Sequence, residues 1–394
     1  MSMHNRSCKD PCQKEAALVS VSYEDLFNHS PNAMEAVNAA FCQEVGFGAL
    51  EVTGVPRWAD IRKRLFDTGA KFTFDQSEAV KQARLSCESE NRVAPGWKGT
   101  PGFEKHSLQS GFYSNLKASS EGGNKDKIWC ENKWPSDSSS IELKSRVNEA
   151  GGIMYEIVLL TLDLAQKALL KNITKIGKEE SFCKHCLPDL RNLAEKSTFL
   201  PSRLVYYDAK FSRYDEIERG DKEYWLPWHV DFNLATALAP ACWVEEEDAL
   251  RDGTIYLDNS AEKGEGLLLR SSSGKVIPAA LRENSVLVQL GAHCHLSSGG
   301  LLRAGPHAVR KDKSKMGMGR FSFGIFVYGP WDARMETSQE LIRLLHNQDQ
   351  DDKDTEKSKN FMFLNDYGGL LEKAYTGETV LDGFKKFETY MNTK

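Results

Sequence analysis

The sequence lacks a long apolar segment, a surplus of positive charge and an even set of cysteines. Met1–Val19 carries charged residues of both signs without a long apolar stretch, so we do not expect a secretory signal there. The longest apolar run, Gly151–Leu170, could be mistaken for a membrane span. Its polar residues fall on one helical face and are Glu156, Asp163, Gln166 and Lys167. This spacing predicts a buried amphipathic helix, so no membrane partner is expected.

Charge and cysteine content narrow the class of protein further. The formal net charge is -5 over 394 residues, whereas a dedicated nucleic-acid binder normally shows a basic face, so no nucleic-acid partner is expected. Nine cysteines, an odd number without a secretory signal, are typical of reduced thiols in a cytoplasmic protein. Cys183-Lys184-His185-Cys186 resembles half of a zinc site, but no second pair lies nearby, and Cys8 and Cys12 could complete it only by a long-range coincidence.

The first half of the chain has mainly helical spacing, and no internal repeat is found. Residues 89–138 are rich in Gly, Ser, Asn and Lys, which predicts loops with short helices. The predicted domains are a mainly helical region at 1–200, a catalytic β-core at 201–335 and a helical extension at 336–394. The expected helices are Asn32–Val45, Pro56–Phe72, Ile141–Asn172 and Ser338–His346, and the third is expected to be broken or bent at Gly151-Gly152. One short strand is expected at Ala49–Val52.

Short β-type runs recur after Ser202, and Ser271–Gly274 is a good hairpin turn between two of them. Eight short strands at such spacing suggest a sandwich or a double-sheet jelly roll. The expected strands are Arg203–Tyr207, Leu226–Phe232, Thr254–Leu257, Gly266–Arg270, Lys275–Pro278, Ser285–Leu290, Ala304–Val309 and Gly319–Tyr328.

One of these strands carries a pair of potential metal ligands. The period of two in a strand places His229 and Asp231 on the same side, where they supply two thirds of a two-His-one-carboxylate set suited to Fe(II). Such a tripeptide is common by chance, so the site needs a distant second histidine. His307 is the best candidate, while His293 and His295 are its rivals and are interpreted as turn and wall residues.

A second pair lies thirteen residues after His307. Arg320 and Ser322 share one face of the predicted strand, and an arginine fork with a hydroxyl would hold a carboxylate. Taken alone, the arginine is better interpreted as an ordinary surface charge beside a strand. Cys242, Trp243 and Phe326 flank the predicted sheet, where core packing is favoured over a role in substrate binding.

These motifs, in this order, resemble the isopenicillin N synthase-like branch of the 2-oxoglutarate/Fe(II) oxygenases, over about Glu35–Arg334. The resemblance departs at Ala292, where the family has Asp, and at Ala308, where it has Arg. The matching segments are Glu44–Pro56 with the family's opening, Ser202–Tyr207 with its tyrosine-bearing strand, His229–Asp231 with H-x-D, Gly266–Pro278 with its hairpin, Leu290–His307 with the segment that ends at the distal histidine, and Arg320–Ser322 with R-x-S.

The resemblance implies a double-stranded β-helix (jelly roll) core in an α+β, mainly β fold, with N-terminal helices packed against it and a C-terminal helix. It implies that His229, Asp231 and His307 bind Fe(II), and that Arg320, Ser322 and Tyr207 hold the far carboxylate of 2-oxoglutarate. The expected activity couples oxidative decarboxylation of 2-oxoglutarate to oxidation of a small organic substrate by O2, in a monomer, with ascorbate as a candidate reductant. Two alternatives remain open: an iron/O2 oxidase that does not use 2-oxoglutarate, and a non-catalytic ligand-binding relative.

Overall fold

The structure, a computed structural model, describes most of the chain between residues 17 and 335 and a short C-terminal piece. All structural statements below refer to these residues. The described ranges are 17–42, 46–74, 96–98, 109–117, 132–134, 138–175, 187–209, 224–246, 257–258, 266–310, 315, 317–335 and 379–383.

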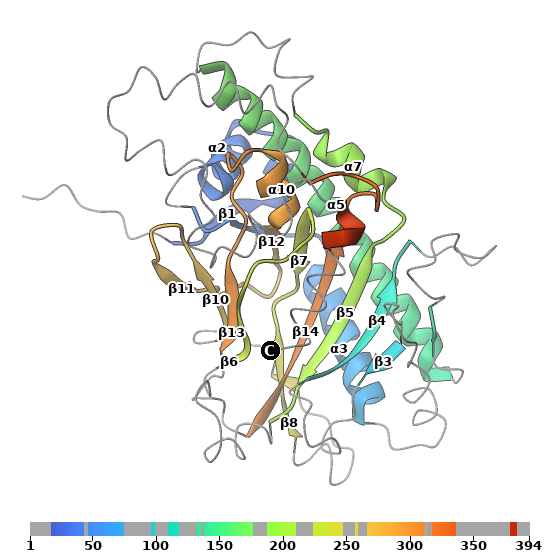
Figure 1. Ribbon diagram of the computed structural model, residues 1–394. Coiled ribbons are helices and arrows are strands. Elements are labelled where there is room, and N and C mark those ends of the chain that lie inside the picture. Colours follow the sequence, from blue (N-terminus) through green and yellow to red (C-terminus); the bar gives the residue numbers. More distant parts are fainter. Residues whose placement is uncertain are drawn as a thin grey trace, which may run out of the picture.

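A large sheet of ten described strands forms the centre of the molecule (Figure 1). Its strands run in the order β1-β2-β12-β7-β14-β5-β4-β3, and β8, followed by β9, pairs with the first half of β14. All pairs are antiparallel except β1 with β2. The bounds are β1 Val19–Ser22, β2 Ala49–Thr53, β3 Gly96–Lys98, β4 Gln109–Asn115, β5 Pro201–Tyr207, β7 Ala235–Leu238, β8 Cys242–Glu245, β9 Leu257–Asp258, β12 Val286–Leu290 and β14 Met318–Val327.

A second sheet of four described strands lies beside the large one, on the left in Figure 1. It is antiparallel in the order β11-β10-β13-β6. Apolar residues of both sheets, among them Leu269 and Leu287, are buried in one cluster, so the two sheets pack against each other. The bounds are β6 Tyr224–His229, β10 Leu267–Arg270, β11 Val276–Pro278 and β13 His307–Arg310.

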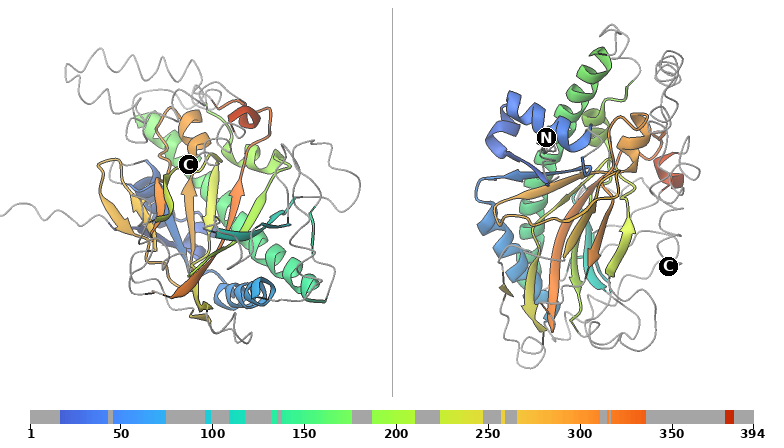
Figure 2. Two further views of the ribbon diagram at one scale, coloured as in Figure 1. Left: turned by 60° about the horizontal axis from the view of Figure 1, so that its bottom comes forward. Right: turned by 90° about the vertical axis from the view of Figure 1, so that its left-hand side faces the viewer.

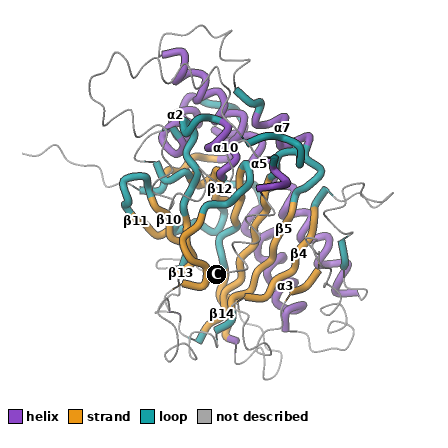
Figure 3. Tube along the Cα trace, viewed as in Figure 1, coloured by secondary structure: helices purple, strands orange, loops and turns teal. Residues whose placement is uncertain are grey.

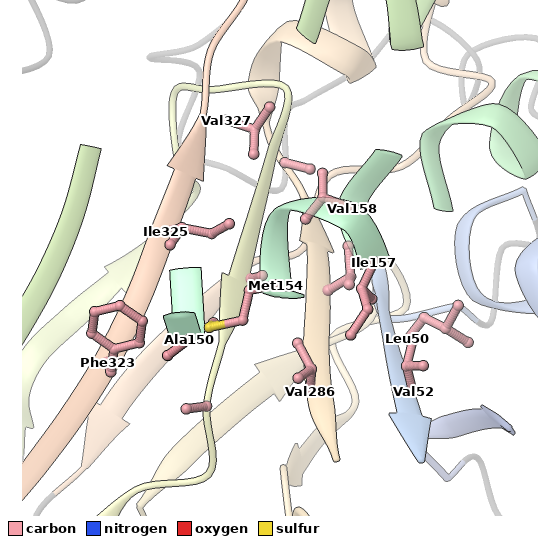
Figure 4. Close-up of a cluster of buried hydrophobic side chains, with 14 of the residues drawn as sticks. Leu50, Val52, Ala150, Met154, Ile157, Val158, Val286, Phe323, Ile325 and Val327 are labelled. Atoms are coloured by element: carbon pink, nitrogen blue, oxygen red, sulfur yellow. The ribbon is translucent and has the colours of Figure 1, made fainter. Parts of the chain in front are cut away.

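Helices cover the other face of the large sheet, as the right-hand view of Figure 2 and the trace in Figure 3 show. The longest, α5 (Ser138–Lys175), presents Met154 and Ile157 to the apolar side chains of the sheet, including Phe323 and Ile325 of β14 (Figure 4). The remaining helices are α1 Tyr23–Phe27, α2 Pro31–Phe41, α3 Trp58–Phe74, α7 Leu190–Lys196 and α10 Ala292–Ser297.

The side chains of the large sheet alternate between these two environments, as strand geometry requires. On β14, Phe321 and Phe323 point to the helices and are fully buried. Arg320 and Ser322 point to the opposite side, toward the small sheet. We call this side the inner face and the helix-covered side the outer face.

Several predicted elements have different limits in the structure. α5 runs without interruption through Gly151-Gly152, so the predicted break is wrong. A Cβ at Gly151 would collide with the Leu116 side chain, which shows that this glycine permits close packing rather than a bend. β4 lies in the region predicted as loops and short helices, and β7 and β8 were not predicted.

Some predictions fall outside the described residues: the Cys183–Cys186 motif, the helix at Ser338–His346 and the start of the strand at Thr254–Leu257. Among the described residues, no helix combines the length and the apolar composition that crossing a membrane requires.

Candidate metal centre

The structure brings His229, Asp231 and His307 together between the two sheets. His229 ends β6 and His307 begins β13, and the two are direct partners across the small sheet. Asp231 lies two residues beyond the end of β6, so it is not within the strand as predicted. The Nε2 atoms of His229 and His307 lie 3.7 Å from Asp231 Oδ1 and 3.8 Å from Asp231 Oδ2, respectively. The three ligand atoms all fall within 4.8 Å of one another.

Backbone carbonyls orient both imidazole rings. His229 Nδ1 lies 2.8 Å from the Pro227 carbonyl oxygen, and His307 Nδ1 lies 2.9 Å from the Gly305 carbonyl oxygen. Because a carbonyl only accepts, each Nδ1 must carry the proton and donate it. With Nδ1 bonded to a carbonyl, the nitrogen left to bind a metal is Nε2, and in both rings Nε2 faces Asp231.

The carboxylate of Asp231 is also fixed by neighbouring groups. Thr236 Oγ1 donates to Asp231 Oδ2 over 2.5 Å, and Asn233 Nδ2 donates to Thr236 Oγ1 over 2.8 Å. The Asp231 carbonyl accepts a hydrogen bond from the N–H of Ala292 at the start of α10. The loop after β6 is thus tied both to the large sheet and to α10.

The electrostatics of the cluster favour a cation. Burial, followed by the charge of His307, lowers the pKa of His229 to about 4, so its ring is neutral at physiological pH. Burial alone would raise the pKa of Asp231, but His307, His229 and the Thr236 hydrogen bond hold it below its ordinary value. The carboxylate of Asp231, almost completely buried between two imidazoles, is a negative charge that a divalent ion bound by all three residues can neutralise.

The donor set fits Fe(II). Two imidazole nitrogens and one carboxylate oxygen on one side of a point, with no fourth described ligand, leave positions open for other ligands. His293 and His295 do not belong to the cluster, and they lie on helix α10 rather than on a turn or strand. Within the described residues, His307 and not His293 or His295 therefore joins His229 and Asp231, as expected from the sequence.

The three residues predicted to hold a carboxylate lie on adjacent strands of the inner face. Arg320 on β14 is the direct partner of Tyr207 on β5, and its guanidinium carbon lies 5.6 Å from the centre of the Tyr207 ring. Ser322 follows two residues later on the same face and is half-buried. Burial raises the pKa of Tyr207 to about 12, so its hydroxyl stays protonated and can donate a hydrogen bond.

Sequence reasoning missed four polar residues around this site. Thr236 and Asn233 follow Asp231 closely, and a hydroxyl or amide within five residues of a ligand carboxylate was the available signal. Gln289 on β12 is the partner of Thr236 across the sheet and is 1% exposed, and neither atom of its amide has a hydrogen bond among the described residues. Arg203 on β5 was predicted only as part of a strand. No sequence pattern indicates a role for Gln289 or Arg203.

Comparison with known proteins gives a result for structures only. No family model matches the sequence, and no curated protein sequence matches it. Among solved structures, a full-length protein from Neurospora crassa in complex with alpha-KG matches over 95% of this chain and 96% of its own, with 15% identity and a TM-score of 0.59. The dioxygenase for auxin oxidation from rice matches over 82% and 87%, with 14% identity and a TM-score of 0.51. JOX2 in complex with 2OG, Fe and JA matches over 82% and 78%, with 16% identity and a TM-score of 0.52.

The chain has the fold of the 2-oxoglutarate/Fe(II) oxygenases. A mixed α/β structure with a large antiparallel sheet, covered by helices, is thereby confirmed. Among the other predictions for single side chains, Cys242 and Trp243 are buried in apolar clusters, as the interpretation of core packing requires. Phe326 lies half-buried on the inner face, where it packs against the apolar cluster that contains Val230 and Tyr328.

Proposed function

We propose that this protein is a 2-oxoglutarate/Fe(II)-dependent dioxygenase that oxidises a small organic molecule with O2. The observation that carries the proposal is the convergence of His229, Asp231 and His307 within a fold shared with such oxygenases. The neighbours are described with alpha-KG, 2OG or Fe, and with thymine, 5-formyluracil or JA, all of them small ligands. By analogy with these neighbours, we propose a small-molecule substrate for this chain.

We propose further that the two sheets correspond to a double-stranded β-helix, whose strands come mainly from the predicted catalytic core at 201–335. The packing of Leu269 against the cluster that contains Leu287 supports this arrangement. The N-terminal strands β1 to β4 extend the large sheet at both ends. The first predicted region therefore contributes more than helical support.

His229, Asp231 and His307 would hold Fe(II), and the bound metal would let O2 oxidise an unactivated C–H bond, with 2-oxoglutarate supplying the other two electrons that O2 takes up. The chain's own contribution is geometry and charge. The Nδ1 hydrogen bonds orient both imidazoles so that their Nε2 atoms face Asp231, and Thr236 keeps the carboxylate of Asp231 in place. No protein acid or base is needed, and none is proposed.

Arg320, Ser322 and Tyr207 would bind the distal carboxylate of 2-oxoglutarate. Arg320 is 3% exposed, so a carboxylate beside it would be removed from water and would need both a cation and hydroxyl donors. Ser322 and the protonated Tyr207 can each offer one hydroxyl. The small sheet would thus hold the metal, while the large sheet would hold the co-substrate.

Binding of 2-oxoglutarate to the anaerobic Fe(II)-loaded protein, measured by titration calorimetry, tests this function. We expect saturable binding that is much weaker when Fe(II) is omitted, because the metal is proposed to chelate one end of the co-substrate. The alternative, an oxidase whose Arg320-Ser322 pair binds a substrate carboxylate, predicts no 2-oxoglutarate binding and substrate oxidation with iron and O2 alone. Those two results together would replace the proposal.

A further inference from the structure

The inner face of the large sheet keeps contact with solvent along β14, β5 and β4. Five residues that alternate on this face are half-buried, while the outer-face residues between them, such as Phe323, Leu204 and Phe112, are almost fully buried. Solvent reaches this side of the sheet, as any ligand that binds here would have to do. The five residues are Tyr113, Arg203, Val205, Ser322 and Phe326.

Arg203 is the cation on this accessible stretch. The register of the sheet places it opposite Gly324 of β14 on one side and Tyr113 of β4 on the other. Gly324 has no side chain, so no β14 side chain occupies the position directly beside Arg203. The guanidinium carbon lies 4.7 Å from the centre of the Phe326 ring and 5.4 Å from the centre of the Tyr113 ring. Two aromatic rings therefore position the charge, an arrangement that stabilises a cation.

Contacts lead from Arg203 to the candidate metal centre. The Phe326 ring beside the guanidinium belongs to the direct cross-strand partner of Thr236. Thr236 in turn donates its hydroxyl hydrogen bond to Asp231. Arg203 therefore lies close enough to the ligand cluster for a molecule of modest size to contact both.

Arg203 and Arg320 form two separate cationic positions. Arg320 is paired with Tyr207, and Arg203 precedes Tyr207 by four residues on the same strand. Four residues of a strand span about 13 Å, so the two arginine side chains leave the backbone at distant points of the inner face. With the distal carboxylate of 2-oxoglutarate proposed to bind at Arg320, the Arg203 position is left for another anionic group.

We propose that Arg203 binds the anionic group of the primary substrate, and that this substrate is a small organic acid with a planar or apolar body. This inference rests on the proposed function. A carboxylate beside the half-buried guanidinium gains a charge-assisted, two-pronged hydrogen bond. The rings of Phe326 and Tyr113 flank the guanidinium and would lie beside the bound acid. Because Phe326 is the direct partner of Thr236, which bonds to Asp231, the remainder of the molecule would extend past Phe326 toward the metal ligands.

Calorimetric titration of the anaerobic Fe(II)·2-oxoglutarate protein with phenylacetate and with phenylacetamide tests the inference. The two probes have nearly the same shape and differ in charge. We expect phenylacetate to bind at least tenfold more tightly than the amide, and the Arg203→Gln variant to lose about ten- to a hundredfold in affinity for the acid alone. Arg203→Lys, which keeps the charge, should recover part of the loss. Arg270→Gln is the matched control, because Arg270 also lies over an aromatic ring, Trp228, at 5.1 Å, but on the small sheet.

Three results would overturn the inference. First, phenylacetate and phenylacetamide could bind the wild-type protein with equal affinity, or neither could bind. Arg203→Gln could leave the preference for the acid intact while thermal melting shows a folded protein. It could instead weaken the binding of 2-oxoglutarate, in which case Arg203 holds the co-substrate. Each of these leaves the proposed function standing if wild-type protein binds 2-oxoglutarate with Fe(II), whereas failure of that binding would count against the proposed function itself.

Discussion

The two faces of the large sheet differ in what they do, although the same strands build both. On β14, Phe323 and Ile325 are buried against α5, while Arg320 and Ser322 point to the space shared with the small sheet. The outer face is apolar and close-packed, which stabilises the fold, and the inner face carries the cations and hydroxyls of the candidate site. Because strand residues alternate, a single β14 sequence can serve stability and ligand binding at neighbouring positions. Substitutions on the two faces should therefore separate these properties.

The largest effect is expected between the two sheets, at the proposed metal ligand Asp231. Asp231→Ala removes the only anionic ligand of the described cluster, so the purified variant should retain no Fe(II) and show no activity. Metal content after anaerobic loading and desalting measures this. Asp332→Ala, at an exposed position, is the control. Undiminished iron in Asp231→Ala would contradict the assignment of the metal centre.

The next effect is expected on the inner face, at Arg320. Arg320→Ala should raise the apparent constant for 2-oxoglutarate about a hundredfold or more, because a buried carboxylate without its cation costs about 3–5 kcal/mol. Iron binding should remain close to that of the wild type, since Arg320 is not a member of the ligand cluster. The readouts are the 2-oxoglutarate constant and the metal content, with Arg270→Ala as control. Equal losses of iron and of 2-oxoglutarate binding would show that Arg320 acts through the fold instead.

A smaller effect is expected at Thr236, which links the inner face to the ligand carboxylate. Thr236→Val keeps the shape of the side chain and removes the donor to Asp231 Oδ2, which should weaken Fe(II) binding about tenfold. Competition with a metal-sensitive dye measures the change. Thr161→Val is a matched control, because Thr161 is also buried but bonds to a backbone carbonyl within α5. An unchanged iron constant in Thr236→Val would mean that the carboxylate is held by other groups.

The smallest effect on ligand binding is expected on the outer face. Ile325→Val removes one methyl group from the contact with α5 and should lower the free energy of unfolding by about 0.5–1.5 kcal/mol. The constants for iron and 2-oxoglutarate should not change in the folded protein. Chemical denaturation and ligand titration of the same sample compare the two properties. A marked change in the 2-oxoglutarate constant would show that the outer face also affects ligand binding, against the proposed division of roles.

The sequence predicted the convergence of three side chains better than the limits of the strands that carry them. His229, Asp231 and His307 belong to short motifs whose order is informative even when each motif alone is weak. β7 was missed because Ala235–Leu238 has neither strong β-branching nor alternation, and its burial on both faces comes from the packed neighbours. Local patterns do not contain that tertiary information.

Two further differences have the same origin. Gly151-Gly152 predicts a break by intrinsic propensity, but packing of Leu116 against Gly151 and burial along α5 outweigh it. Arg203 resembles an ordinary charged residue in a strand until the register sets it opposite Gly324. The role proposed for Arg203 depends on which strands become neighbours, and that cannot be obtained from spacing along the chain.

The central claim is tested most directly by the fate of 2-oxoglutarate in the purified protein. With Fe(II), ascorbate and O2, we expect the wild-type protein to form succinate in step with 2-oxoglutarate consumed, even without the primary substrate, and the Asp231→Ala variant to form none. Succinate is quantified by mass spectrometry after removal of protein. No succinate from an iron-loaded, folded wild-type protein, or equal amounts from wild type and Asp231→Ala, would contradict the account.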